Sequence, residues 1–441
     1  MESASDGATT LESPSKVLSR IHGSLPPRSW HPHPNSRQLL TMQNDIWPIL
    51  DTQIRQTLAS FRPLLQTHLR RLPLGQYGIM LAMYGRTRRT AQPSFIVLSS
   101  ERFSETTIQG IPQEFRIVSL RYTHKQGSQD VFLKAYTARP APGVAIGSAD
   151  RPHTSFSAGW WVRDCASGSV FNLTCAHSLR EPRREAPHAW SRNDELGSPQ
   201  YVDCPPHALI EETCVQLKRE IQELGHLNDE KRKHLQEIDD CRAKKEFAMV
   251  VVAGYGEYAL AEENGQVMLA EDWALLRTKS RRIGKNEFPA VDGFSALRFT
   301  SLGEIEYGAT VTMNGAASGR TEGIVMDCIE STLDQHDNET RNWVVRDKRW
   351  GQFSSDADLG APIGLQGGRA GGILLGGGIG VDADGREFPF SYITPLSTIF
   401  ARIEQVTGRK LEIPDVYNLS HPTARDHYHR AKTGQARISE R

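Results

Sequence analysis

The sequence predicts a mainly β chain that carries a helical insertion and is preceded by a small α/β domain. Beyond residue 143, short apolar or alternating runs such as "SVFNLTCA" and "GGILLGGGIGV" are separated by glycine and polar turns, which is typical of a β-sandwich or barrel. A charged, proline-free segment over residues 207–246 interrupts these runs with apolar residues at helical spacing. Before the proline-rich "ARPAPG" at 138–143, helix-like and strand-like segments over residues 44–140 indicate the α/β domain.

The N-terminal part divides into a tail and this domain. Residues 1–43 are rich in Ser, Pro and His without periodicity, so they cannot bury enough apolar area to offset ordering entropy, and we expect a disordered tail. From Ile46 onward apolar residues recur at spacings of three and four, which predicts an amphipathic helix that Pro63 kinks or divides. Strand-like stretches follow at 77–85, 93–100, 115–120 and 130–136. Because no phosphate-binding glycine loop or catalytic constellation occurs in this sequence stretch, we expect a support or interaction role.

The insertion has its own apolar pattern. Its apolar residues follow alternating steps of four and three, at Ile210, Cys214, Leu217, Ile221 and Leu224. This spacing predicts a long helix, or a helical hairpin that turns near 224–229, with an exposed stripe that matches a coiled-coil seam. Such a stripe would bind a partner or a second copy of the chain. The alternative is that it packs on its own barrel or on the second arm of the hairpin.

Composition excludes several classes of partner. Lys plus Arg equals Asp plus Glu at 52 each, so no basic field attracts nucleic acid or a membrane surface, and we expect neither partner.

The sequence contains neither a signal-peptide-like apolar run near its start nor a stretch of roughly 20 apolar residues, so we expect a cytoplasmic protein. Six cysteines without a CxxC pair argue against a zinc site and a dense disulfide framework, and we expect neither metal nor cofactor.

Three segments of the β-rich part carry candidate chemistry. His177 in "FNLTCAHSL" follows an apolar strand, Asp272 in "AEDWALLRT" comes immediately before another, and "SSDADLGAPIG" begins at Ser354. A serine nucleophile needs a histidine to accept its proton and a carboxylate to orient that histidine, and this chain order is one of those known. Taken singly, His177 also fits a structural histidine, and Asp272 fits a turn carboxylate.

Residues 143–408 resemble a trypsin-like serine peptidase of the intracellular type common in fungal genomes. "TCAHS" resembles the family's "TAAHC", "DWALL" resembles "DIALL", and "GAASGRTEGIV" resembles the "GRTSGxTxG" turn and strand. "DLGAP" resembles "DSGGP", and "GGILLGGG" resembles the strand that walls the substrate pocket. The resemblance implies a two-barrel, chymotrypsin-like domain over 141–408, interrupted by the insertion and followed by a tail over 409–441. A helix is expected near 396–408 from its own spacing.

The resemblance also assigns roles, with two departures from the family pattern. It makes His177 the general base and Asp272 its orienting partner, and it places Leu359 at the nucleophile position. Leucine has no lone pair and no proton to give, so no acyl-enzyme can form through it. Ala357 replaces the family's glycine, whose N–H helps to form the oxyanion hole together with that of residue 359, and its side chain disfavours that backbone geometry. Ser178 stands where the family has a disulfide cysteine, which suits a reducing compartment.

Three functions are compatible with this pattern. We favour an inactive peptidase homologue that acts as a binding or regulatory module, with a protein or peptide in the degenerate cleft. An alternative is an active endopeptidase with a displaced hydroxyl nucleophile, for which Ser354 and Ser355 are the candidates. The third is a structural protein whose barrel presents the coiled-coil insertion.

Overall fold

The computed structural model describes residues 45–415 apart from 73, 75–76, 102, 104–107, 124–138, 180–189, 192–199, 225–228, 243, 263–264, 292, 333–338 and 349–351. The expected strand at 130–136 and the expected N-terminal tail lie outside the described residues. Among the helices of the described part, none combines the length and the apolar character needed to cross a bilayer.

The chain divides into two compact units, and each unit is made of three separate segments of the sequence. The first comprises Met1–Thr123, Met326–Glu339 and Ile379–Phe388, and the second comprises His124–Val325, Thr340–Gly378 and Pro389–Arg441. The small domain expected over 44–140 therefore also takes two later segments of the chain. Strands β17 (Gly319–Thr332) and β20 (Arg369–Val381) each begin in the second unit and end in the first.

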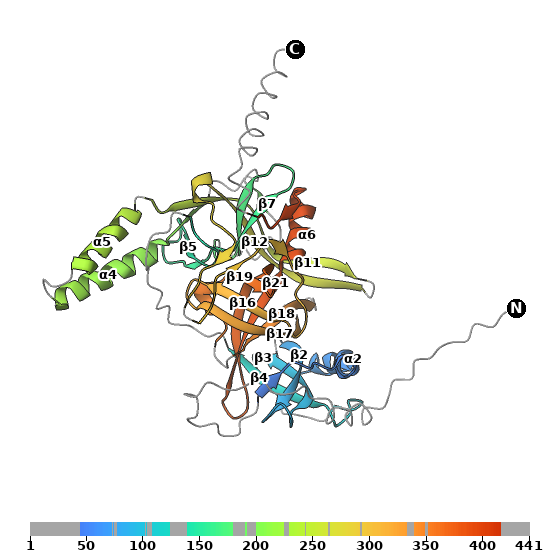
Figure 1. Cartoon of the computed structure of the whole chain (residues 1–441). Helices are drawn as coiled ribbons and strands as arrows, with labels where there is room; N and C mark the ends of the chain where they lie inside the picture. Colours follow the sequence, from blue (N-terminus) through green and yellow to red (C-terminus); the bar gives the residue numbers. More distant parts are fainter. Residues whose placement is uncertain are drawn as a thin grey trace, which may run out of the picture. The chain divides into compact units, whose positions relative to one another are not determined.

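The first unit is the α/β domain (Figure 1). Its own elements are β1 (Asp45–Trp47), α2 (Thr52–Ser60), α3 (Arg62–Leu69), β2 (Tyr77–Gly85), β3 (Gln92–Ser99) and β4 (Arg116–Thr123). Strand β2 pairs antiparallel with β1 and β3, and β3 runs parallel to β4. The end of β17 pairs with β2 and the end of β20 pairs with β4, both antiparallel. Asp51 caps the start of helix α2, and its carboxylate accepts the N–H groups of Gln53 and Ile54.

The second unit begins with a closed barrel. Its strands are β5 (Ala145–Ser148), β6 (Phe156–Ser157), β7 (Trp160–Asp164), β8 (Val170–Thr174), β10 (Tyr201–Asp203), β11 (Glu246–Glu262) and β12 (Gly265–Thr278). Strand β5 pairs with β6, which leads into β7, and β7 pairs with β8 and β8 with β12. Strand β12 pairs with β11, β11 with β10, and β10 again with β5. The ring closes with every pairing antiparallel, so the predicted barrel is confirmed.

A half-barrel follows, and most of its strand residues belong to the same unit. Its strands are β16 (Thr310–Gly315), β17, β18 (Glu339–Asp347), β19 (Pro362–Leu365), β20 and β21 (Glu387–Pro395). Strand β16 lies between β17 and β19, β19 pairs with β20, and β18 pairs with β21, all antiparallel. The expected C-terminal helix is α6 (Leu396–Thr407), and it ends at Gly408 with φ of +69°. Strand β22 (Leu411–Glu412) pairs with β7, so this part of the expected tail belongs to the barrel unit.

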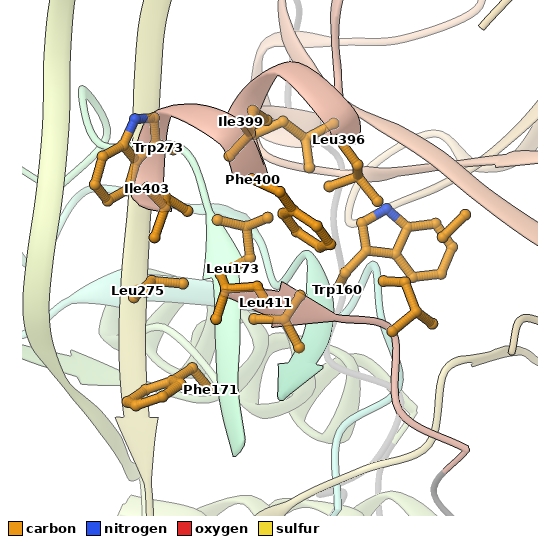
Figure 2. Packing of buried hydrophobic residues seen from close by; sticks show 14 of the residues in the cluster. Trp160, Phe171, Leu173, Trp273, Leu275, Leu396, Ile399, Phe400, Ile403 and Leu411 are labelled. Carbon is orange, nitrogen blue, oxygen red and sulfur yellow. The ribbon is translucent and has the colours of Figure 1, made fainter. Parts of the chain in front are cut away.

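Helix α6 closes one side of the barrel core (Figure 2). It contributes Leu396, Ile399, Phe400 and Ile403 to a buried cluster that also contains Trp160, Phe171, Leu173, Trp273, Leu275 and Leu411. Side chains alternate along a strand, so Asp272 and Ala274 face away from the side occupied by Trp273 and Leu275. Ala274 accordingly belongs to a second buried cluster, which also contains Cys175 and Ala176. This alternation directs Asp272 toward the segment that carries His177.

The insertion is a helical hairpin of α4 (His207–Leu224) and α5 (Asp229–Arg242) (Figure 1). Of the two predicted forms, a single long helix and a hairpin, the hairpin is confirmed. The exposed seam, however, is wrong for the residues nearest the barrel. Ile210, Cys214 and Leu217 are buried with Ile238 of α5 and Ala145 of β5. For these three residues the alternative is therefore observed, because the second arm and the barrel together cover them, whereas Ile221 is partly exposed.

Candidate active site

His177 and Asp272 meet because their strands are neighbours. Strand β8 ends at Thr174, which lies opposite Ala274 of β12, so the residues after Thr174 approach those before Ala274. His177 Nδ1 lies 2.5 Å from Asp272 Oδ2. The other carboxylate oxygen, Oδ1, accepts the backbone N–H groups of Ala176 at 2.7 Å and of His177 at 2.9 Å. The expected contact between the two side chains is present, and three hydrogen bonds fix it.

The charge of Asp272 controls the protonation of His177. The Asp272 side chain is 3% exposed and the His177 side chain 28% exposed. Burial alone would lower the pKa of His177, but the charge of Asp272 and its hydrogen bond more than reverse this, so the pKa is raised above its ordinary value. The ring of Tyr255 lies 6.4 Å from that of His177, and burial together with Asp272 raises the pKa of this phenol. The site therefore makes the imidazole easier to protonate, and the phenol harder to ionise, than the same groups in water.

Cys175 lies next to this pair but does not supply a nucleophile. Burial, and then the charge of Asp272, raise the pKa of its thiol far above the ordinary value. Its Sγ donates to Ser178 Oγ at 3.2 Å. The thiol therefore stays protonated and has a partner.

The same three side chains do not fit a metal ion as they are arranged. Their ligand atoms all lie within 4.8 Å of one another. Two ligands of a tetrahedral zinc ion with bonds of about 2.0–2.1 Å are separated by about 3.3 Å. His177 Nδ1 and Asp272 Oδ2 are only 2.5 Å apart, which is a hydrogen-bond distance.

The loop in which we expected the nucleophile position is held by a buried carboxylate. Asp358 is fully buried at the end of a single 3-10 turn, Asp356–Asp358. Its Oδ1 accepts the N–H groups of Ala317 at 2.7 Å and Ser318 at 3.1 Å. Its Oδ2 accepts the N–H of Ser355 at 2.8 Å and the hydroxyl of Ser355 at 3.1 Å. Four donors thus fix the residue that precedes Leu359.

Leu359 itself packs on the first barrel. Its carbonyl accepts the N–H of Ser157 at 2.8 Å, and its half-buried side chain packs on the cluster that contains Cys175 and Ala176. Gly360 follows with φ of +76°, and a Cβ there would lie 2.3 Å from Thr174 Oγ1. The loop therefore sits directly on the end of β8, close in the chain to His177.

Both alternative serines have hydrogen-bond partners in the structure. The hydroxyls of Ser354 and Ser391 lie 2.6 Å apart and both residues are buried. The Ser355 hydroxyl donates to Asp358. Ala357 is also fully buried, so the methyl group that replaces the family's glycine hydrogen is enclosed. The roles expected for the backbone of Ala357 and Leu359 stay predictions.

Sequence reasoning missed a buried ion pair beside the site. Glu271, the neighbour of Asp272, is 2% exposed. It pairs with Arg402 of α6 through two hydrogen bonds of 3.0 and 3.1 Å, and accepts the indole N–H of Trp273 at 3.0 Å. An acidic residue within a strand gives no signal for a partner in a helix 131 positions later. This pair ties α6 to the strand that carries Asp272.

Comparisons with known proteins give fold likenesses only. No family model matches the chain, and no curated protein matches it. Protease A of Thermobifida fusca is 14% identical, with 62% of this chain and 98% of that chain covered and a TM-score of 0.34. A Nocardiopsis protease is 12% identical, with 62% and 98% covered and a TM-score of 0.33. The chymotrypsin of Cellulomonas bogoriensis is 12% identical, with 61% and 96% covered and a TM-score of 0.33. At these TM-scores the likeness says nothing about activity, which depends on the site's own geometry.

Proposed function

We propose that this chain is a trypsin-like serine peptidase homologue without peptidase activity, which binds a protein or peptide at the surface around His177 and Leu359. One observation carries the proposal. The base and its orienting carboxylate are paired at 2.5 Å, while the residue at the nucleophile position has an aliphatic side chain. No acyl-enzyme can form through leucine, so a paired imidazole has no hydroxyl proton to accept.

The chemistry of the same residues suits binding. His177 is part-exposed and protonated more readily than an ordinary histidine, so it can donate a hydrogen bond to a carbonyl or carboxylate oxygen. Leu359 and Tyr255 are partly buried, and each packs against the same apolar cluster. Burying such a side chain completely is worth roughly 1.5–3 kcal/mol, so covering their exposed parts would add to affinity. An extended peptide with an acceptor group and an apolar side chain would meet both kinds of contact.

The competing function, an active endopeptidase, would require Ser354 or Ser355 to leave its present partner. Ser354 would have to leave a buried hydroxyl pair, and Ser355 would have to leave Asp358. A buried polar group that loses its partner costs about 1–3 kcal/mol, so these hydroxyls are stabilised where they are. We therefore place the displaced-nucleophile enzyme second.

A fluorophosphonate probe separates the two functions, because the reagent reacts only with an activated serine oxygen. We expect no labelling of the native chain at neutral pH, as judged by intact mass. Stoichiometric labelling that His177→Ala abolishes would refute the proposal. If labelling occurs, Ser354→Ala and Ser355→Ala identify the hydroxyl, and a chain labelled independently of His177 would show only an adventitious reactive serine.

A further inference from the structure

The helical hairpin reaches the loop of Leu359 through a turn of the half-barrel. The buried stripe of the hairpin packs with Ala145 of β5, and Ala316 packs against the same cluster. Ala316 begins the turn between β16 and β17. The hairpin therefore covers two parts of the barrel unit that are far apart in sequence.

The turn at 316–318 is in direct contact with the loop. Ala316 N–H donates to Ser157 Oγ at 3.0 Å, and Ala317 and Ser318 N–H donate to Asp358 Oδ1. A Cβ on Gly315 would lie 2.3 Å from the same Oδ1, so the carboxylate rests on the backbone of this turn. Any displacement of the turn would therefore move the acceptor or break its bonds.

Asp358 is sensitive to such a displacement because it is a buried charge. Two of its four donors come from the turn and two come from Ser355 of its own loop. A buried carboxylate that loses half of its donors is strongly destabilised, so the loop would rearrange to recover them. Leu359 directly follows this carboxylate and moves with it.

We infer that the hairpin α4–α5 is a positioning element for the loop that carries Leu359, acting through the turn at 316–318 and the carboxylate of Asp358. A ligand that binds the hairpin more tightly in one arrangement of the turn would change the loop, and a ligand at the loop would change the hairpin by the same coupling free energy. The inference that the hairpin regulates the binding site rests on the proposed function. The structural coupling between hairpin and loop does not rest on it, because the coupling runs through the turn at 316–318 and Asp358 and does not depend on whether the chain is an active peptidase.

Hydrogen exchange of the full chain, followed by mass spectrometry, tests the coupling. Ile210 is fully buried in the stripe, whereas Val215 on the same helix is 56% exposed. In Ile210→Ala we expect the peptides that cover 315–320 and 355–361 to exchange about tenfold faster or more, because the turn loses its support. In the matched control Val215→Ala both peptides should exchange as in the native chain. Faster exchange confined to α4 and α5 would overturn the inference, and Ile210→Val repeats the test if the alanine variant does not fold.

A second experiment tests the coupling in the reverse direction, from the loop to the hairpin. Asp358→Asn keeps the size of the side chain but replaces one acceptor oxygen by a donor, so α4 should exchange faster if the coupling is reciprocal. Asp164→Asn is the control, because Asp164 is a buried carboxylate of the same unit that is bonded to Ser167 and Arg409 instead. Equal effects of both variants on α4 would overturn the inference. Fluorophosphonate labelling of the native chain that His177→Ala abolishes would refute the proposed inactivity without touching this result, so the two failures are distinguishable.

Discussion

Asp272→Asn removes the charge that faces His177 while keeping the size of the side chain. The remaining carbonyl oxygen can still accept the N–H groups of Ala176 and His177, which are 2.7 and 2.9 Å from the native Oδ1. The lost contact is the charge-assisted bond of 2.5 Å to the imidazole. Hydrogen bonds to charged groups are worth about 1.5–3 kcal/mol and neutral ones about 0.5–1.5 kcal/mol. Where His177 is protonated, we expect the barrel unit to lose about 1.5–3 kcal/mol of its free energy of unfolding. Where His177 is neutral, we expect a smaller loss, because the acceptor is still charged but the donor is not.

The pH dependence follows from the direction of the pKa shift. The pKa of His177 is raised in the folded chain, so its protonation adds stability that is fully present below the unfolded value of about 6.5 and is lost as the pH rises through the folded value. In the variant, burial is left to lower the pKa of His177, so the variant loses stability as the pH falls. The difference in the free energy of unfolding between native chain and variant should therefore be larger at pH 5 than at pH 9.

Urea unfolding followed by tryptophan fluorescence measures this difference, since Trp160, Trp161 and Trp273 are all buried in the barrel unit. Asp164→Asn is the control. Burial alone would raise the pKa of Asp164, but hydrogen bonds and the charge of Arg409 lower it, so its effect should be equal at both pH values. An unchanged gap for Asp272→Asn, or a His177 ring that titrates by NMR below about 6.5, would refute the reasoning.

Two further variants test the loop. Leu359→Ser combined with Ala357→Gly supplies a hydroxyl and removes the buried methyl. We expect a fluorophosphonate to label this variant, and we expect His177→Ala to abolish the labelling. Labelling that survives the histidine change would contradict the assignment of Leu359 to the nucleophile position. Gly360→Ala should lower the melting temperature of the barrel unit much more than Gly168→Ala does. Both glycines have positive φ, at +76° and +67°, which costs about 1–2 kcal/mol for alanine, but only Gly360 has atoms of β8 within 2.3 Å of the new methyl. Equal melting temperatures would show that the loop does not press on β8 as described.

The pairing of His177 with Asp272 could be predicted because the signal is local. Each residue lies within a few positions of an apolar strand, and an antiparallel pairing of those two strands suffices to bring them together. The positions of Ala357 and Leu359 in the loop follow from the short motif around them. The barrel was predictable for a similar reason, since each strand and turn carries its own pattern.

What could not be predicted depends on contacts between distant segments. A heptad stripe has the same spacing whether its cover is a partner or a second arm, and here Ile238 of α5 and Ala145 of β5 supply the cover. Asp358 is satisfied by N–H groups about 40 positions earlier, and backbone donors leave no mark in a sequence. The pairing of β17 with β2 joins Glu330 to Ile79, and no local pattern specifies that choice of edge.

Because the ends of β17 and β20 complete the sheet of the first unit, this unit can finish folding only late in synthesis. The sheet made from residues 45–123 leaves the ribosome with part of the β2 edge and the outer edge of β4 unpaired, because their partners lie at 330–331 and 379–381. At about 5–20 residues per second, those edges stay unpaired for roughly 10–50 s before the segments that cover them are synthesised. Unpaired edges are templates for pairing with other chains, so the nascent protein passes through a period in which chaperones or neighbouring chains compete for the same hydrogen bonds. The barrel unit, although it comes later in the sequence, must emerge almost to its end before the earlier domain can finish folding.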